Sequence, residues 1–474
     1  MTIARAVPDR YVPWLAYGYA VIVGLTVGHF LLGIPIQLSD SFGQLLKVIG
    51  PWRELIYGEF TQHGFMRPLD WGSIKLVYEL SGGSYFAWFR GIHAIEVVIL
   101  ALLYVALVRP KVVRDLLVLP LGLAILIGLH TFQGTVREAF PLNHFIAIVI
   151  FCLAAANLVM ARHRWVNDIM AVLLFAVAAL TLESGLLVGV VIVGGRLLGE
   201  KGVSRAAAAS VVLLLAGYLF LRFGLFGVGS PELAERSSGF GFTTLEPSDI
   251  VERFGSNRMP FYAYNIVSSG LSVLFSEPTG GVFALTRSLL SGTITLADLV
   301  SPVASLSMTV LIGLYIWRRR HAWSSWQLDR DDRLVILFLL VLCANAFISF
   351  PYLKDVVMSP AGAFLAVAGF VATRSALSYL PDHLPAVPRT AVIAAFAIIG
   401  TTWAIRVTGT YLDLRRAAYV ERNDWAYADG SRNDDGTTVA DADRRLFRTL
   451  HDDALFVHAA PPPLKPPLGV LFGR

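Results

Sequence analysis

The segment FRGIHAIEVVILALLYVALVR, residues 89–109, decides what kind of fold this chain adopts. Every residue from Val97 to Val108 is apolar, and Arg109 ends the run. Apolar stretches of this kind, about 20 residues long, are typical of helices that cross a membrane. Similar stretches recur along most of the chain, so the sequence predicts an all-α polytopic membrane protein.

The composition supports the same fold class. The chain has 474 residues, of which 55% are hydrophobic and 15% charged, and its mean hydropathy is +0.63. A soluble domain contains about 25% charged residues. The net charge of +5 is typical of basic cytoplasmic loops and does not indicate nucleic-acid binding. Cys152 and Cys343 both lie in apolar runs, and the sequence contains no Cys/His metal signature.

The hydropathy pattern predicts about eleven transmembrane helices, and basic residues set their orientation. The first span has no small-residue cleavage site after it, so we interpret it as a retained helix. Basic residues precede the first span and follow every second one, which predicts a cytoplasmic N-terminus and an extracytoplasmic C-terminus. The predicted spans are 13–35, 87–108, 116–132, 144–161, 169–182, 186–198, 206–227, 303–318, 334–350, 360–373 and 391–408.

Residues 1–408 are predicted to form one membrane module, with a charged extracytoplasmic tail at 409–474 that is small or partly disordered. The two long outer loops are 36–86 and 228–302. Within the second loop, the moderately apolar stretches 269–275 and 288–300 are expected to lie flat as interfacial helices, with an extra span as the alternative. The short spans at 169–182 and 186–198 are expected to form a hairpin, with a single long helix as the alternative.

The first outer loop holds three candidate site residues. Asp40 follows the first span and is a candidate general base for an acceptor hydroxyl or amine; its alternative role is to cap a helix that begins at Ser41. Arg67, fixed locally by Pro68, is suited to bind phosphate. With Asp70 it could instead form a surface ion pair that stabilises little.

Five further candidates lie at the predicted outer ends of later spans. Glu138 lies on the short loop between the third and fourth spans, and Glu183 lies at the hairpin tip, where a carboxylate is costly unless it has a role or faces water. Lys354 follows Tyr352 in a short outer loop, against the positive-inside trend, and so favours an anionic ligand. Arg258 lies beside tyrosines, an arrangement that suits a sugar phosphate or an interfacial aromatic belt.

The charged run at 329–333 is not expected to form part of a site. Asp329, Asp331 and Asp332 alternate with arginines on the predicted cytoplasmic side. The simplest interpretation of that pattern is a solvated loop.

The order of these motifs resembles the GT-C superfamily of integral-membrane glycosyltransferases, especially the protein mannosyltransferase and aminoarabinose-transferase type. The resemblance rests on Asp40, on FMRPL at 65–69, on the segment from Phe89, on Glu138 and on TLESG at 181–185. It covers residues 30–200 well and the remainder by topology only. The sequence departs from the family pattern at Gly91, where Asn is usual, and at Leu182, where Lys is common.

The resemblance implies a function at the extracytoplasmic face of a bacterial inner membrane. The donor would be a polyprenyl-phosphate-linked sugar, and the acceptor a glycan, a lipid or a protein. Asp40 would be the base, and Arg67, Lys354 and Arg258 would neutralise the leaving phosphate. No nucleotide or other cofactor is predicted. A divalent metal is compatible with such a site but unsupported, because Ser41 follows Asp40 where a second acid would be needed.

Two other functions remain open from the sequence. An O-antigen ligase or polymerase also uses lipid-linked sugars, but it would be expected to have a histidine in a large outer loop, and 228–302 has none. A lipid or polysaccharide transporter would be expected to show related halves or broken helices. The sequence shows no such repeat, and its acidic residues cluster at one face of the membrane. A membrane scaffold without enzymatic activity is the remaining alternative.

Overall fold

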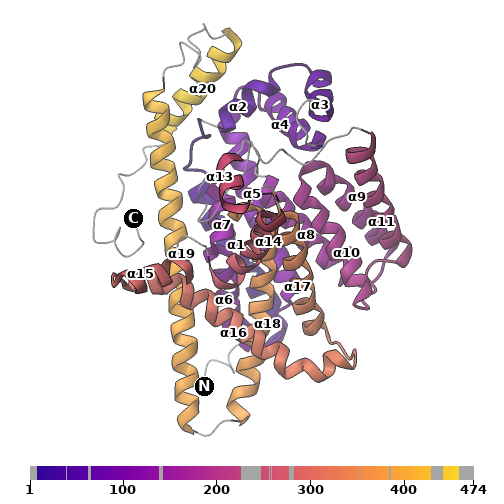
Figure 1. Cartoon of the computed structure of the whole chain (residues 1–474), viewed down its shortest axis with the longest axis vertical. Coiled ribbons are helices and arrows are strands. Elements are labelled where there is room, and N and C mark those ends of the chain that lie inside the picture. Colours follow the sequence, from indigo (N-terminus) through magenta and orange to yellow (C-terminus); the bar gives the residue numbers. More distant parts are fainter. Residues whose placement is uncertain are drawn as a thin grey trace.

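The structure is a computed structural model that shows an all-helical chain (Figure 1). No β-strand occurs within the part that it describes, which is residues 8–38, 40–61, 66–137, 142, 144–225, 247–255, 257, 259–276, 282–351, 353–383, 386–428 and 441–457. The predicted all-α fold is confirmed.

The helices fall into a large bundle and a set of shorter elements. The bundle contains α1 (Val12–Leu31), α5 (Tyr85–Val108), α6 (Val113–Gly128), α7 (His130–Arg137), α8 (His144–Val159), α9 (Trp165–Thr181), α10 (Leu187–Leu197), α11 (Arg205–Leu219), α14 (Met259–Phe275), α16 (Leu296–Ser324), α17 (Arg330–Ile348), α18 (Ser359–His383) and α19 (Ala386–Tyr427). The shorter elements are η2 (Asp9–Tyr11), α2 (Asp40–Val48), α3 (Trp52–Thr61), α4 (Pro68–Ser81), η3 (Glu183–Leu186), the π-helical η4 (Phe220–Leu225), α13 (Pro247–Phe254), α15 (Val282–Ser291), η6 (Asp355–Met358) and α20 (Asp441–Val457).

Several helices are suited to cross a membrane. Within the described ranges, six are long and apolar enough to do so, or seven if α6 and α7, bent by 58° at their junction, count as one span. The six are Asp9–Leu31, Tyr85–Val108, Arg205–Leu225, Asp298–Ser324, Asp355–Tyr379 and Thr390–Tyr427. The chain is therefore a multi-pass membrane protein.

Helix α18 forms the centre of the bundle. Every residue from Ala361 to Thr373 is buried, and the helix packs against α6, α16 and α17. Small residues allow this close approach: a Cβ at Gly362 would lie 2.3 Å from the hydroxyl oxygen of Thr131, and one at Gly369 would lie 2.7 Å from the sulfur of Met308. Because lipid is as apolar as the bundle itself, such close packing is a main source of helix association in membranes.

Helices α1 and α5 pair through a row of small residues. Ala16, Ala20, Gly24 and Gly28 recur at every fourth position of α1, and all are buried. A Cβ at Gly24 would lie 2.8 Å from the Cα of Val98 in α5. This spacing places the small residues on one face, as in membrane helix pairs with small residues four apart.

The bend between α6 and α7 is held by α19. A bend frees backbone carbonyls, and in a membrane each must find a donor. Arg406 donates from Nε to the carbonyl oxygen of Gly128 (2.8 Å), and the Thr410 hydroxyl donates to that of Ile127 (3.1 Å). Gln133 in α7 donates in turn to the Thr410 hydroxyl (3.0 Å). The bend is therefore a fixed feature of the fold.

Helices α2, α3, α4 and α20 gather at one end of the molecule, which we name the cap end (Figure 1). Lys75 of α4 is buried, and it donates to the carbonyl oxygens of Val48 (3.0 Å) and Gly50 (2.7 Å) at the end of α2. Trp425 is fully buried there and donates from Nε1 to the carbonyl oxygen of Ile36 (2.6 Å). The cap end therefore has an apolar core of its own.

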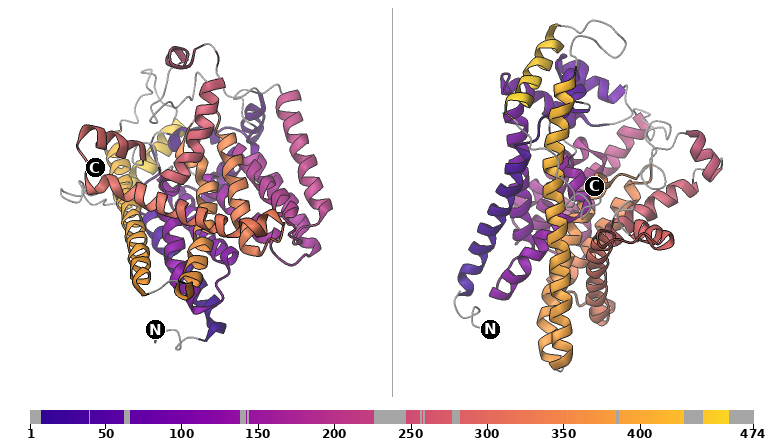
Figure 2. Two further views of the ribbon diagram at one scale, coloured as in Figure 1. Left: turned by 60° about the horizontal axis from the view of Figure 1, so that its bottom comes forward. Right: turned by 90° about the vertical axis from the view of Figure 1, so that its left-hand side faces the viewer.

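The tail predicted at 409–474 begins inside α19, which crosses residue 408 without a break. Figure 2 shows α19 running along the long axis of the molecule. Its last turns and α20 pack on α2 through Trp425, Phe42 and Phe447, with ring centroids 5.3–5.8 Å apart. The described part of the tail is thus helical and contributes to the cap end.

The predicted second outer loop, 228–302, also contains regular helix in its described part. Residues 269–275 belong to α14, which packs against α16 and α17 and buries Ser269, Ser272 and Val273. Residues 288–300 are divided between α15 and α16, with Gly292 at φ +68° between them. The hairpin expected from 169 to 198 is confirmed, because α9 and α10 are joined by the short turn η3.

The interpretation of Asp329, Asp331 and Asp332 as a solvated loop is wrong. Asp332 is fully buried in the first turn of α17, where it accepts hydrogen bonds from Arg319, Trp323 and the Tyr315 hydroxyl (2.5–3.0 Å). Burial alone would raise the pKa of Asp332, but the hydrogen bonds from Arg319 and Trp323 outweigh it and lower the pKa to about 2. Asp329 and Asp332 instead tie α17 to α16 through Arg319, and Asp331 ties it to α18 through Arg374 (2.5 Å).

We expect Gly24→Val to lower the free energy of unfolding by about 1–3 kcal/mol, because the added side chain must push α1 away from α5. Thermal unfolding of the purified protein in detergent measures the loss. Gly18→Val is the matched control, since a Cβ at Gly18 has no atom within 4 Å. Equal melting temperatures for the two variants would contradict this account of the α1–α5 pairing.

Candidate functional site

The structure describes four of the eight predicted site residues completely. These are Arg67, Asp70, Glu183 and Lys354. Asp40 is the first residue of α2, and its side chain lies outside the described residues. Glu138, Arg258 and Tyr352 lie outside them as well.

Glu183 is positioned by the turn that joins α9 to α10. The chain leaves α9 at Leu182 in an extended conformation and enters η3 at Glu183. Gly185 makes the turn tight: its N–H donates to the carbonyl oxygen of Leu182 (2.8 Å), and a Cβ there would lie 1.9 Å from the carbonyl oxygen of Ala178. The TLESG motif is therefore a structural unit that presents the Glu183 carboxylate.

Arg67 pairs with this carboxylate across a long sequence separation. It is the N-cap residue of α4, with Pro68 in the first turn. Its Nε and Nη2 lie 2.9 and 2.5 Å from Oε2 of Glu183. The two side chains are 22% and 21% exposed, so this contact is largely removed from water. The alternative of a surface pair between Arg67 and Asp70 is wrong, because each residue has a different partner.

Arg222 is a second cation at Glu183, and the sequence prediction missed it. It lies in η4, at the end of α11, and its side chain is only 6% exposed. Its Nη1 lies 3.3 Å from Oε1 of Glu183 and donates to the Tyr218 hydroxyl (2.9 Å). A single arginine inside the apolar run predicted as a span at 206–227 was the available signal.

Among the described residues of this cluster, two guanidinium groups meet one carboxylate. Burial raises the pKa of Glu183, but the charge and hydrogen bonds of Arg67, together with the charge of Arg222, outweigh burial and hold the pKa below its ordinary value. The carboxylate is therefore ionised at neutral pH. Guanidinium groups gathered in this way are suited to bind an anion such as phosphate.

Asp70 takes part in a second polar group next to the first. Its Oδ1 lies 2.7 Å from Nδ1 of His144, the first residue of α8. Nε2 of His144 lies 3.0 Å from the hydroxyl oxygen of Ser73, and this hydroxyl also donates to the carbonyl oxygen of Asp70 (2.8 Å). His144 was not predicted as a site residue, although it stands in the TVREAFPLNHF segment.

Lys354 lies on a different element from these two groups. It precedes η6, which packs against α7. There, Nε2 of the buried His130 lies 3.6 Å from Oδ1 of Asp355. Polar side chains therefore occur at several places around α7, the start of α8 and the start of α18.

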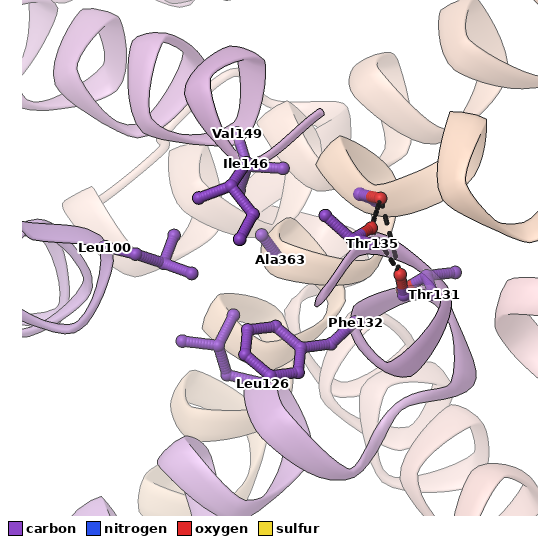
Figure 3. Close-up of a pocket in the computed structure, with 9 residues that line it drawn as sticks. Leu100, Leu126, Thr131, Phe132, Thr135, Ile146, Val149 and Ala363 are labelled. Atoms are coloured by element: carbon purple, nitrogen blue, oxygen red, sulfur yellow. Dashed lines mark hydrogen bonds between the residues drawn. The ribbon is translucent and has the colours of Figure 1, made fainter. Parts of the chain in front are cut away.

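A small cavity lies between α7, α8 and α18, where Thr131, Thr135 and Ser359 provide polar atoms among apolar side chains (Figure 3). Thr135 and Ser359 hydrogen-bond to each other at one side of it. Its volume is about 10 Å³, which is about the space of one water molecule. It is therefore too small to hold a sugar or a lipid.

Neither a metal site nor a comparison with known proteins assigns a role to these residues. Within the described ranges, no group of three or more His, Cys, Asp or Glu side chains is arranged to hold a metal ion. No protein-family model, curated protein or solved structure matches the chain. The function must therefore be argued from the residues of the site themselves.

The depressed pKa of Glu183 predicts a pH dependence of stability. Since the folded-state pKa lies below the ordinary value of 4.5, the ion pair stabilises the fold above about pH 4.5 and loses that effect as the pH falls through the folded-state value. Melting temperatures of the wild type and Glu183→Gln should differ most above pH 4.5 and converge in stronger acid.

Glu54→Gln is the control for this experiment, because Glu54 is an exposed acid in α3. Its melting temperature should follow that of the wild type throughout. A constant gap between the wild type and Glu183→Gln across the pH range would contradict an ionised, arginine-bound Glu183.

Proposed function

We propose that this chain is a membrane glycosyltransferase of the GT-C type. It would move a sugar from a polyprenyl-phosphate donor to a glycan, lipid or protein acceptor at the extracytoplasmic face of the bacterial plasma membrane. The observation that best supports the proposal is the meeting of Arg67 and Arg222 at Glu183. The three residues come from distant parts of the sequence and bring two guanidinium groups to one carboxylate near the ends of membrane helices.

The topology proposed with this function has eleven spans, a cytoplasmic N-terminus and an extracytoplasmic C-terminus. Contacts between basic loops support it. Arg330 donates to the carbonyl oxygen of Leu107, and Arg109 donates to that of Met160. These arginines therefore meet at a single end of the bundle, as the positive-inside rule requires of cytoplasmic loops. The cap end would then be extracytoplasmic.

The proposed reaction needs a proton acceptor and a stabilised leaving group. The acceptor hydroxyl attacks the anomeric carbon as its proton passes to the carboxylate expected at Asp40. The bond from that carbon to the phosphate oxygen breaks with inversion at the carbon, and polyprenyl phosphate leaves with the electron pair. Arg67 and Arg222 neutralise the charge that develops on the phosphate, and Glu183 holds both guanidinium groups in place.

The other predicted residues have supporting roles in this proposal. Glu138 would act beside Asp40, and Asp70 would keep α4 docked through His144. Arg258, Tyr352 and Lys354 would add contacts to the donor. No metal ion or nucleotide has a part in the scheme.

One observation favours transport as a second candidate. The 58° bend between α6 and α7 is a broken helix, and transporters use broken helices to bind ligands. Here, however, Arg406 and Thr410 already donate to the carbonyls of Gly128 and Ile127. Because the chain itself satisfies these groups, we favour the glycosyltransferase.

The test uses purified protein in nanodiscs with a panel of polyprenyl-phosphate sugars and candidate acceptors. Mass spectrometry follows the release of the sugar from the lipid. We expect turnover by the wild type, no turnover by Asp40→Asn, and a loss of about 10²–10³-fold for Arg67→Ala, since a donor that stabilises developing negative charge is removed.

Arg53→Ala is the matched control, because Arg53 is an exposed arginine in α3, and it should keep full activity. Full activity of Asp40→Asn would remove Asp40 as the base. A folded wild type that neither binds nor turns over any of these lipids would contradict the proposed function and favour transport.

A further inference from the structure

The second polar group at the cap end has the connectivity of a serine nucleophile with its base. Asp70 contacts Nδ1 of His144 at 2.7 Å, and Ser73 contacts Nε2 of the same ring at 3.0 Å. An acid on one ring nitrogen and a hydroxyl on the other is the arrangement that activates serine in acyl transfer on unrelated folds. We propose that Ser73, His144 and Asp70 form a nucleophilic relay that takes an acyl group from a lipid ester.

Burial and sequence position support a relay. The side chains of His144 and Asp70 are only 10% and 13% exposed, so their contact is shielded from water and holds the ring in one orientation. Ser73 is half-buried rather than enclosed, and in this proposal the substrate reaches it from the exposed side of α4. Asp70 and Ser73 lie three residues apart on α4 and therefore on the same face of that helix, while His144 reaches them from α8.

The Ser73 hydroxyl has two alternative acceptors. It donates either to the carbonyl oxygen of Asp70, 2.8 Å away, or to Nε2 of His144. A rotation about the bond from Cβ to Oγ moves the proton between them. A ring that donates its Nδ1–H to Asp70 can accept the hydroxyl proton at Nε2.

The location of α4 identifies the source of the acyl group. Leu76 and Leu80 on α4 are 50% and 58% exposed, and the nearby aromatic residues Trp52, Tyr57 and Trp88 are 40–68% exposed. Exposed aromatic and aliphatic side chains at the ends of membrane helices lie at the level of lipid headgroups. Phospholipid ester carbonyls occupy that depth, so phospholipid is the acyl donor that reaches Ser73.

The proposed reaction is an acyl transfer in two steps, and it needs neither an oxidant nor a metal ion. The Ser73 oxygen bonds to the ester carbonyl carbon as its proton passes to Nε2 of His144. The ester C–O bond then breaks, and the lysophospholipid oxygen takes the proton from His144. An acceptor hydroxyl attacks acyl-Ser73 in the same way, its proton passing through His144 to the Ser73 oxygen.

The experiment uses the full chain in nanodiscs and an alkyl fluorophosphonate, which transfers its phosphorus to an activated serine with loss of fluoride. Peptide mass spectrometry locates the adduct. We expect modification of Ser73 in the wild type, none at that position in Ser73→Ala, and about 10²–10⁴-fold slower modification in His144→Ala, because the base is missing.

Ser81→Ala is a matched control. Ser81 lies on the same helix and donates to the carbonyl oxygen three residues earlier (2.7 Å), as Ser73 does, but it is buried. We therefore expect no adduct on Ser81 in the wild type, and an unchanged rate of Ser73 modification in Ser81→Ala. Size-exclusion chromatography establishes that each variant is folded. An unmodified Ser73 in folded wild type, or an equal rate in folded His144→Ala, would overturn the relay and leave a static clamp between α4 and α8.

A second measurement tests the donor. Nanodiscs of phosphatidylethanolamine and phosphatidylglycerol should yield lysophospholipid with the wild type and none with Ser73→Ala. Modification of Ser73 without lysophospholipid from either lipid would overturn phospholipid as the donor. None of these readouts depends on sugar transfer, so the relay and the proposed glycosyltransferase can fail separately.

Discussion

A carboxylate at the end of an apolar helix bundle needs a cation, and that constraint organises the cap end of this protein. Glu183 lies at the tip of the α9–α10 hairpin, where two arginines neutralise it. Arg67 comes from the first long loop and Arg222 from the end of α11, so one carboxylate joins three parts of the chain. Removing it would leave the buried Arg222 and the half-buried Arg67 without this carboxylate, which is the more costly way to break such a group.

The same constraint acts on backbone groups inside the bundle. The bend after Gly128 would leave carbonyls without donors, and α19 supplies them through Arg406 and Thr410. Arg406 is thus a buried charge with a structural role, held also by the Ser305 hydroxyl (3.0 Å). A polar residue within a membrane helix is therefore not by itself evidence of a ligand site, and the partners that it contacts decide between the two.

The arginine cluster at Glu183 and the group of Asp70, Ser73 and His144 are neighbours, and both take residues from helix α4. Arg67 begins this helix, while Asp70 and Ser73 follow on its first turns. In the two proposals, the first group binds an anion through its arginines and the second supplies a hydroxyl beside a base. Lys75 fixes the same helix against the end of α2, so both groups are held on a rigid support. A rigid scaffold of this kind is what a binding or catalytic constellation requires.

The sequence predicted the helical membrane fold well, because long apolar runs have few other stable outcomes. It also identified Arg67, Asp70 and Glu183 as residues of interest, since charge near a membrane span is costly. It did not give their partners in the fold: Arg67 and Asp70 are close in sequence, and the alternative of a pair between them is wrong, because they contact Glu183 and His144. The run at Asp332 was misjudged for the same reason, since burial depends on packing between α16 and α17.

What the sequence by itself determined is where apolar helices lie and where charge interrupts them. Both follow from the local cost of placing polar groups in lipid. Only the tertiary structure decided that Arg222 reaches Glu183, that α19 closes the α6–α7 bend, and that His144 stands between Asp70 and Ser73. Each of these contacts joins segments on different helices, and helix packing, which no local pattern encodes, sets their distance.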